Sequence, residues 1–218
     1  MMLPRKPAAV VFDMDGLLFD SESLYQEAVV LAAVESGYEV VPELFHQMVG
    51  LPVVQGRAVL LSHFGEDFPV DAFQEAWVRH FWVIAETHLT LKPGVRELLD
   101  TLDELALPRA IATSSTHRTV QRHLSAHHLL GRFDTVVGNG DYEAGKPAPD
   151  PFLTAAHRLG VDPQLCLALE DSPNGVRSAA AAGMMTVMVP DLVAPTDEIR
   201  RLCVYVAPDL HDVRRLIL

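Results

Sequence analysis

Five short runs of apolar, largely β-branched residues are the feature of this sequence that most restricts its fold. Each run is continuous rather than alternating, which is typical of strands in a sheet that is covered on both faces. Helical stretches separate most of the runs, and strands that alternate with helices form right-handed βαβ units. The sequence therefore predicts an α/β fold with a parallel sheet. The expected strands are 8–12, 109–113, 135–138, 166–169 and 186–189, with a possible edge strand at 203–207.

The helical stretches also have recognisable ends. They are expected at 95–105, 119–128, 151–159 and 173–182, and a last one closes the chain at 209–218. The stretch that starts at Pro173 is the clearest, because Asp171 or Ser172 can cap it and proline suits a first turn. Gly183 follows its alanine-rich end, as glycine commonly does after a helix.

One long segment, from residue 21 to about residue 91, breaks the alternation of strands and helices. It contains helical periodicity, interrupted by glycines and prolines, and no convincing strand. One apolar face in it follows i, i+3 and i+4 spacing. The face consists of Phe73, Ala76, Trp77, His80, Phe81, Ile84 and Ala85. We therefore predict a helical domain of residues 20–91, inserted into a core domain of residues 1–19 and 92–218.

Charge and composition exclude some partners. The chain has 218 residues, of which 49% are apolar and 21% are charged, an ordinary globular mixture. Its net charge is −12, and residues 20–91 hold eleven acids against two arginines. A segment so acidic would repel the phosphate backbone of nucleic acid, so we expect a small substrate and no nucleic acid partner.

Apolar runs and cysteines bear on the compartment. No run approaches the roughly 18 apolar residues of a membrane span, and the first run is too short for a signal peptide. We therefore expect no membrane association. Cys166 and Cys203 lie in apolar runs and fit buried free thiols in a reducing cytoplasm. The sequence does not indicate an oligomeric state.

Two acidic residues stand at the end of the first expected strand. Asp13 and Asp15 are separated by one residue and followed by Gly16. Ligands of parallel α/β sheets bind outside the carboxyl ends of the strands. Two carboxylates near one pocket repel each other and lose hydration unless a cation or a proton offsets their charge. Taken alone, the pattern fits a functional pair and an ordinary strand-to-turn transition equally well.

Polar residues follow later strands as well. Thr113 and Ser114 could hold phosphate oxygens at the start of a helix, although such residues also cap helices for structural reasons. Lys146, one of three lysines, stands in a turn fixed by two prolines and could neutralise a negative ligand, although a lone loop lysine is usually solvated. Glu170 and Asp171 form a second acid pair. This pair could share a Mg²⁺ ion with the first pair, since that ion prefers oxygen ligands.

Together these residues suit phosphoryl transfer, because a parallel sheet would gather all these strand ends around one crevice. A phosphate monoester is a dianion, and an attacking carboxylate needs that charge neutralised by a metal and a lysine. Asp13 would attack phosphorus in line and form an aspartyl-phosphate. Asp15 would protonate the leaving oxygen and later deprotonate the water that hydrolyses the intermediate.

The motifs at these strand ends resemble those of the haloacid dehalogenase-like superfamily, in the branch that carries a helical cap after the first strand. The resemblance covers nearly the whole chain and implies a Rossmann-like, doubly wound core with a cap that opens and closes over the substrate. The four matching signatures are Asp13-Met14-Asp15-Gly16, Thr113, Lys146 and Glu170-Asp171.

The resemblance implies a role for each signature. Asp13 would be the nucleophile, and Asp15 would be the acid and base and a Mg²⁺ ligand through its backbone carbonyl. Thr113 and the Ser114 amide would hold the phosphoryl group, and Lys146 would neutralise its charge. The two acids of the fourth signature would complete the Mg²⁺ site around the nucleophile.

Differences between this chain and particular branches of the superfamily reduce the number of activities that it could have. Dehalogenases lack the second acid of the first signature, whereas this chain has Asp15, and phosphonatases use a cap lysine, whereas residues 21–91 contain none. The nearest resemblance is to β-phosphoglucomutase and the sugar-phosphate phosphatases. The mutase has a histidine and an arginine where this chain has Tyr25 and Val53. We therefore expect a phosphatase that hydrolyses a small phosphorylated metabolite, most simply a sugar phosphate.

Two alternatives stay open. Arg57, one helical turn after Val53, could replace the missing arginine and contact the substrate, so the first alternative is a phosphosugar mutase of the β-phosphoglucomutase type. The second is a binding switch that accepts a phosphoryl group without being an enzyme, as receiver domains do. A receiver domain has no need of such a helical insert, and its acids are spaced differently.

Overall fold

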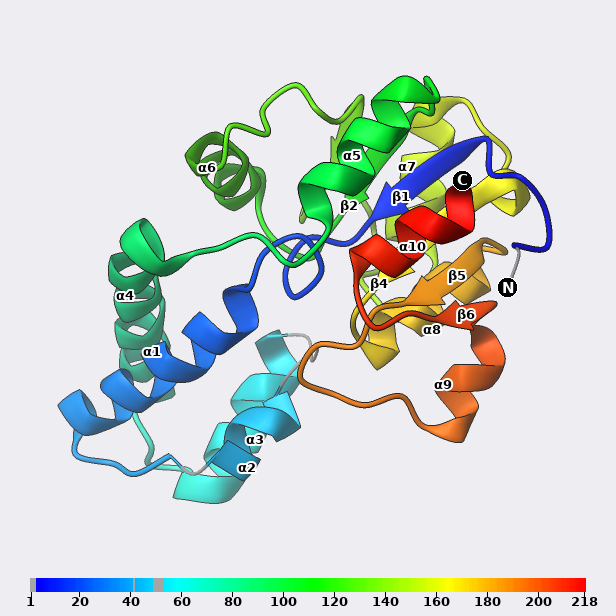
Figure 1. Cartoon of the computed structure of the whole chain (residues 1–218). Coiled ribbons are helices and arrows are strands. Elements are labelled where there is room, and N and C mark those ends of the chain that lie inside the picture. Colours follow the sequence, from blue (N-terminus) through cyan, green and yellow to red (C-terminus); the bar gives the residue numbers. More distant parts are fainter. Residues whose placement is uncertain (1–2, 41, 49–52) are drawn as a thin grey trace. The chain divides into compact units, whose positions relative to one another are not determined.

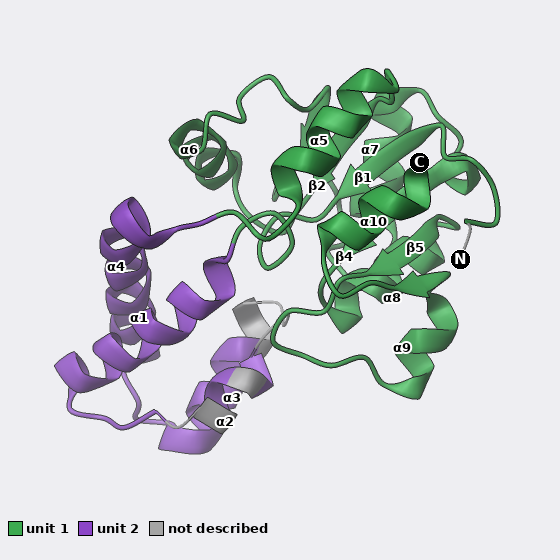
Figure 2. Cartoon of the chain, in the orientation of Figure 1, with its two compact units in different colours: residues 1–19, 91–218 green, residues 20–90 purple. Residues whose placement is uncertain are grey.

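The computed structural model describes residues 3–40, 42–48 and 53–218, without the side chains of residues 42, 43, 46 and 53–55. The chain divides into two compact units (Figure 1, Figure 2). Unit 1 comprises Met1–Phe19 and Leu91–Leu218, and unit 2 comprises Asp20–Thr90. The second boundary lies one residue before the boundary expected from the sequence.

Unit 1 is built on one six-stranded sheet in the order β3-β2-β1-β4-β5-β6, with every neighbouring pair parallel. The predicted α/β fold with a parallel sheet is confirmed. The order reverses beside β1, so the switch point, where ligands of such sheets bind, lies between β1 and β4. The strands are β1 (Ala9–Phe12), β2 (Arg109–Ala112), β3 (Thr135–Val137), β4 (Cys166–Glu170), β5 (Met185–Met188) and β6 (Tyr205–Val206).

Helices cover both faces of this sheet, which makes the core doubly wound as predicted. In Figure 1, α5 and α10 lie on one face, and α7 and α8 lie on the other. The expected helices are present within two residues of their predicted ends, and α9 and a 3₁₀ turn at Pro163–Leu165 were not expected. The helices are α5 (Val95–Glu104), α6 (His117–Ala126), α7 (Asp150–Leu159), α8 (Pro173–Ala181), α9 (Asp197–Leu202) and α10 (Leu210–Ile217).

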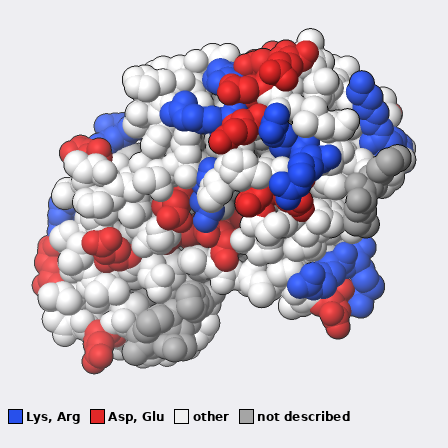
Figure 3. Space-filling view, viewed as in Figure 1, with Lys and Arg blue, Asp and Glu red and all other residues white. Residues whose placement is uncertain are grey.

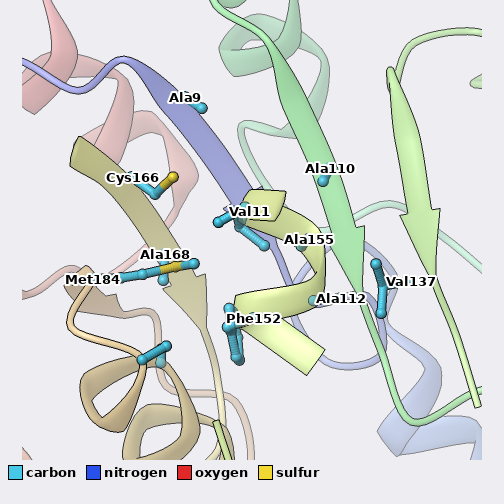
Figure 4. Packing of buried hydrophobic residues seen from close by; sticks show 13 residues of the cluster. Ala9, Val11, Ala110, Ala112, Val137, Phe152, Ala155, Cys166, Ala168 and Met184 are labelled. Carbon is cyan, nitrogen blue, oxygen red and sulfur yellow. The ribbon is translucent and has the colours of Figure 1, made fainter. Parts of the chain in front are cut away.

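Small side chains line the interface between the sheet and α7. Phe152 of α7 fills its centre, and alanines of the sheet and the helix surround it (Figure 4). Small residues allow the helix backbone to approach the sheet closely, and a densely packed interior holds its strands rigidly. The labelled members of this cluster are Ala9, Val11, Ala110, Ala112, Val137, Phe152, Ala155, Cys166, Ala168 and Met184.

Unit 2 is a bundle of helices, and its described part contains no strand. The helices are α1 (Ser21–Ser36), α2 (Pro42–Met48), α3 (Val53–Phe64) and α4 (Val70–His88). The apolar face predicted for 73–85 belongs to α4 and packs on α1. Tyr25 of α1 stacks on Phe81 of α4 with ring centroids 3.8 Å apart, and Trp77 donates to the Tyr25 carbonyl at 2.8 Å. Phe81 is buried, whereas Tyr25 and Trp77 are half-buried, so this aromatic group joins α1 to α4 without being fully enclosed.

The chain leaves unit 1 and returns to it at one place. Phe19 and Leu91 form an antiparallel bridge, and the Lys92 amide donates to the Leu18 carbonyl at 3.0 Å. On the side of unit 2, the Asp20 amide donates to the Thr90 carbonyl at 2.9 Å. The two connections therefore run side by side.

The acidic charge of unit 2 is dispersed. On the face shown in Figure 3, acidic side chains are scattered over unit 2 rather than gathered into one patch. No helix in the described ranges is both long and apolar enough to cross a membrane. Both cysteines are free thiols, but only Cys166 is buried as predicted. The prediction was wrong for Cys203, which is half-buried because it precedes the short edge strand β6.

Candidate active site

The predicted residues of unit 1 meet at the carboxyl edge of the sheet. The Asp13 amide donates to the Leu169 carbonyl of β4 at 2.9 Å, and the Thr113 amide donates to the Val137 carbonyl of β3 at 3.0 Å. Each residue therefore continues its strand by one step and is held by the neighbouring strand. The strands β1, β2 and β4 are neighbours. The sheet thus brings the first, second and fourth signatures together.

A buried lysine joins two of these strand ends. The Lys146 ammonium donates to Asp13 Oδ1 and, at 2.6 Å, to Glu170 Oε1. The exposed fractions of the three side chains are 8% for Lys146, 9% for Asp13 and 1% for Glu170. The ammonium also lies over the Phe152 ring of α7, 5.1 Å from its centre, where a cation is attracted to the aromatic face. Lys146 is therefore part of the site and not a solvated loop residue.

The protonation of this cluster follows from its charge. Burial raises the pKa of the Asp13 carboxyl to about 8, and Lys146 opposes that shift while Glu170 and Asp15 reinforce it. Burial lowers the pKa of Lys146, but the two carboxylates outweigh burial and the pKa stands above its ordinary value. Two carboxylates thus share one ammonium. A proton or a cation must supply the missing positive charge.

The start of α8 fixes the Glu170 side chain. Glu170 Oε2 accepts hydrogen bonds from the Ser172 amide at 2.9 Å and from the Ser172 hydroxyl at 3.0 Å. The Ser172 hydroxyl also accepts from the Gly175 amide, so Ser172, one of the two predicted caps, is the N-cap. A Cβ on Gly175 would lie 1.7 Å from Glu170 Oε1. Glycine is therefore required at this position for the Glu170 carboxylate to reach Lys146.

Oxygen ligands converge beside the lysine. Asp13, Glu170 and Asp171 each offer an oxygen within 4.8 Å of the others, and all three residues are buried. Gly16, at φ +83°, leaves room for Asp171, because a Cβ there would lie 2.4 Å from Asp171 Oδ2. An all-oxygen set of buried carboxylates fits Mg²⁺. The residues present therefore suit the ion that the sequence implied.

A further carboxylate borders the same place and was not expected from the sequence. Asp191 Oδ1 accepts from the Lys92 ammonium at 2.7 Å. Its Oδ2 is buried, has no hydrogen-bond partner within residues 3–40, 42–48 and 53–218, and lies 3.3 Å from the point a Cβ on Gly16 would occupy. The sequence feature that could have predicted Asp191 is its position, because it follows strand β5 at the same carboxyl edge of the sheet.

Asp15 lies between two side chains that sequence reasoning did not assign to it. The Ser115 hydroxyl donates to Asp15 Oδ2 at 2.7 Å. His123 Nε2 lies 3.9 Å from Asp15 Oδ1. Burial lowers the pKa of the His123 imidazole, Asp15 opposes the shift, and His127 and Arg122 add to it.

The second signature is held from two sides. Thr113 is buried, and its Oγ1 accepts from the Ser115 amide at 3.0 Å. The Tyr142 hydroxyl donates to the Thr113 carbonyl at 3.2 Å. Ser114, by contrast, is exposed at the start of the loop to α6. Contact of Thr113 and Ser114 with a phosphoryl group stays a prediction.

The residues predicted in the helical insert belong to unit 2. The Arg57 guanidinium pairs with the Asp71 carboxylate, between α3 and α4, and its contact with a substrate stays a prediction. Tyr25, which stands where the mutase has a histidine, is half-buried and stacks on Phe81 of α4. Gly50–Pro52 and the side chain of Val53, where the mutase arginine was compared, lie outside the described residues.

Unit 1 is an α/β domain that gathers paired acids and a buried lysine at the carboxyl edge of a parallel sheet. Residues 7–183 match the sequence model of the haloacid dehalogenase-like hydrolases, and the chain belongs to that family. The resemblance inferred from the four signatures is confirmed.

Several relatives are phosphatases by name. The chain is 39% identical to a probable pseudouridine-5'-phosphatase of Drosophila melanogaster, over 86% of this chain and 83% of that one. It is 31% identical to hexitol phosphatase B of Escherichia coli K12, over 90% of each chain. Among solved structures, a hydrolase from Pseudomonas syringae is 25% identical, with a TM-score of 0.80 over 95% of this chain and 96% of that one.

Proposed function

We propose that this chain is a Mg²⁺-dependent phosphatase that hydrolyses a small phosphomonoester through an aspartyl-phosphate on Asp13. The observation that carries the proposal is the placement of the buried Lys146 ammonium between Asp13 and Glu170, with Asp171 within ligand distance of both acids. A buried carboxylate beside a fixed cation can approach a phosphate dianion that would otherwise repel it.

Asp13 and Lys146 perform the first half of the reaction. An Asp13 oxygen attacks phosphorus, the bond to the leaving oxygen breaks, and the phosphoryl group passes to the carboxylate. Lys146 stabilises charge on the transferring oxygens, and Glu170 holds the ammonium in place. Bound Mg²⁺ would add positive charge at the same oxygens. The side chains of Asp13, Glu170 and Asp171 and the backbone carbonyl of Asp15 would hold that ion.

Asp15 moves the proton in both halves. It gives a proton to the leaving oxygen in the first half and takes one from the attacking water in the second, so it returns to its starting state. Its Oδ2 is fixed by Ser115, which keeps the carboxyl group at the carboxyl edge of β1. Thr113 and the Ser114 amide would bind the oxygens of the phosphoryl group at the loop before α6.

The proposed substrate is a phosphorylated sugar or polyol. Relatives named as a pseudouridine-5'-phosphatase and a hexitol phosphatase support this class. We propose further that unit 2, residues 20–90, acts as the cap that selects the leaving group, and that the enzyme works in the cytoplasm as a catalyst for small metabolites.

The test is phosphate release from a panel of sugar and polyol phosphates, including β-glucose 1-phosphate, with and without Mg²⁺. We expect turnover that requires the metal and that falls by at least about 10³-fold in Asp13→Asn. The matched control is Asp134→Asn, because Asp134 bonds the Arg109 amide at the other end of β2 and should leave the rate unchanged. Conversion of β-glucose 1-phosphate to glucose 6-phosphate without phosphate release would establish the mutase instead. A phosphorylated Asp13 that never turns over would establish a binding switch.

A further inference from the structure

The buried face of helix α6 contains a histidine where an apolar residue is expected. The other buried positions of the helix are Val120 and Leu124, which are three and one residues away, so His123 lies on the stripe that faces the core. Its exposed fraction is 1%. Burying an imidazole is costly unless a polar group meets it. The position of the ring therefore needs a reason other than packing.

One polar group beside the His123 ring is the Asp15 carboxyl group. Nε2 of His123 lies 3.9 Å from Asp15 Oδ1, whereas the Ser115 hydroxyl donates to the other oxygen, Oδ2. The Phe19 ring packs edge-on against the imidazole, with centroids 5.3 Å apart, and limits its rotation. Asp15 thus lies between a loop hydroxyl and a helix imidazole that are both held in place.

We propose that His123 is a positioning residue that, together with Ser115, fixes the orientation of the Asp15 carboxyl group for proton transfer. The inference rests on the proposed function, in which Asp15 gives a proton to the leaving oxygen. The distance of 3.9 Å exceeds that of a hydrogen bond, but catalytic contacts are often long before substrate binds and shorten in the complex.

This role has a consequence that packing alone does not have. An alkyl phosphate needs a proton on its leaving oxygen, because an alkoxide is a poor leaving group. p-Nitrophenolate leaves without one. A misplaced Asp15 should therefore slow the first chemical step for an alkyl ester much more than for p-nitrophenyl phosphate. A general loosening of the fold would slow both esters alike.

The experiment measures first-turnover release of the leaving group by rapid quench, with enzyme in excess and Mg²⁺ at saturation. We expect His123→Phe to slow release of the leaving group from a hexitol phosphate by roughly 10²-fold. Release of p-nitrophenol from p-nitrophenyl phosphate should slow by less than about 5-fold. His123→Gln, which restores an N–H donor, should recover most of the alkyl rate. The matched control is His127→Phe, because His127 packs on the same Phe19 ring with centroids 5.3 Å apart. It should change neither rate by more than about 2-fold.

The outcomes separate this inference from the proposed function. Wild-type enzyme that releases no leaving group from either ester would overturn both. Active wild-type enzyme whose His123 variants lose equal factors on the two esters would overturn only the positioning role of His123. Urea unfolding of each variant is measured alongside to show that it folds. If His123→Phe does not fold, the test compares His123→Gln with His123→Asn by the ratio of the rates on the two esters. Only the shorter Asn side chain should fail to reach Asp15, so only His123→Asn should lose the alkyl rate selectively.

Discussion

Asp13, Lys146 and Glu170 form a buried triplet with two negative charges and one positive charge when all three side chains are ionised. A low-dielectric site with an unbalanced charge takes up a proton or a cation. The raised pKa of Asp13, about 8, means that a proton fills this role in the metal-free protein at neutral pH. If Mg²⁺ binds here as proposed, it would displace that proton.

We predict that Mg²⁺ binding releases a proton in a pH-dependent way. Because the folded pKa of Asp13 stands above the ordinary 3.8, the carboxyl group is protonated below pH 8. Binding should release about 0.9 proton at pH 7 and about 0.1 at pH 9, and apparent affinity should rise over that range. Calorimetry in buffers of different ionisation enthalpy measures the release. A binding enthalpy independent of buffer at pH 7 would contradict the prediction.

A second residue-scale prediction compares two glycines in helices. Gly175→Ala should lower the free energy of unfolding by about 2–4 kcal/mol, because its Cβ would overlap the Glu170 carboxylate. It should also weaken Mg²⁺ binding by roughly 10-fold or more. Gly56→Ala is the control, since nothing lies within 4 Å of its Cβ, and it should stabilise α3 by up to about 1 kcal/mol. Urea unfolding and Mg²⁺ titration of both variants test the prediction. Equal changes in stability and in Mg²⁺ affinity for the two variants would contradict it.

At this scale the sequence predicted residues that end strands and missed residues that reach the site from elsewhere. Asp13, Glu170 and Asp171 follow buried runs, so the parallel sheet alone brought them to one edge. His123 lies on a helix face, and its partner Asp15 is distant in sequence, so no local pattern connects them. Lys92 and Asp191 are likewise joined only by the tertiary fold.

The loop between β3 and α7 carries Lys146, and Asp141 fastens it to two helices. Asp141 Oδ2 accepts from Arg158 of α7 at 3.1 Å and from the Gly138 amide at 3.0 Å, and His117 Nε2 of α6 lies 2.8 Å away. The pKa of Asp141 is lowered to about 2, chiefly by the hydrogen bond from Arg158 and further by the Gly138 amide and His117. Burial raises the pKa, but by less than Arg158 lowers it. The position of Lys146, the lysine of the proposed site, thus depends on a carboxylate outside that site.

We predict that Asp141→Asn destabilises the protein only where Asp141 is ionised. A depressed folded pKa stabilises the native state above pH 3.8, and the contribution is lost as pH falls toward 2. Asp141→Asn should therefore cost about 1–2 kcal/mol at pH 7 and progressively less below pH 4. Urea unfolding across pH measures the difference.

The control for this prediction is another paired aspartate of unit 1. Asp100 binds Arg132 at 2.8 Å, but its side chain is 65% exposed, so Asp100→Asn should cost less than about 0.5 kcal/mol. An Asp141→Asn effect that is constant from pH 7 to pH 3 would rule out the ionic explanation.

Elements were predicted best where they are long and periodic. The strands of unit 1 and the helices α5, α7, α8 and α10 follow runs that the apolar pattern defines. Helix α9, of six residues, was missed because a short surface helix buries one residue, Ile199, and leaves almost no periodic signal. Helix α6 begins two residues earlier than predicted, because Thr116 caps it by accepting from the Thr119 amide.

At the scale of the whole molecule, unit 2 is joined to unit 1 by two adjacent connections. Phe19 and Leu91 are bridged, so the two ends are as close as neighbouring strands. A short turn could join them in place of unit 2. Unit 1 would keep its sheet and every residue of the four signatures.

We predict that replacing residues 21–89 with a short Gly/Ser turn leaves unit 1 folded. Mg²⁺ affinity should stay within about 3-fold of the intact chain, while kcat/KM for the best sugar phosphate falls by at least about 10²-fold. Hydrolysis of acetyl phosphate, a small activated substrate, should fall much less. Circular dichroism and cooperative urea unfolding check the fold, and loss of metal binding in a folded variant would contradict the prediction.

Strand β1 is the innermost strand of the sheet, because it lies between β2 and β4 and all of its residues are fully buried. Backbone amides at such a place exchange with solvent only when the whole core opens, whereas edge strands and separate helical bundles open earlier. Asp13, the proposed nucleophile, directly follows this strand, which we expect to exchange most slowly. Gentle heating should therefore erode discrimination between substrates before it ends catalysis, and a partly denatured enzyme would become less selective before it became inactive.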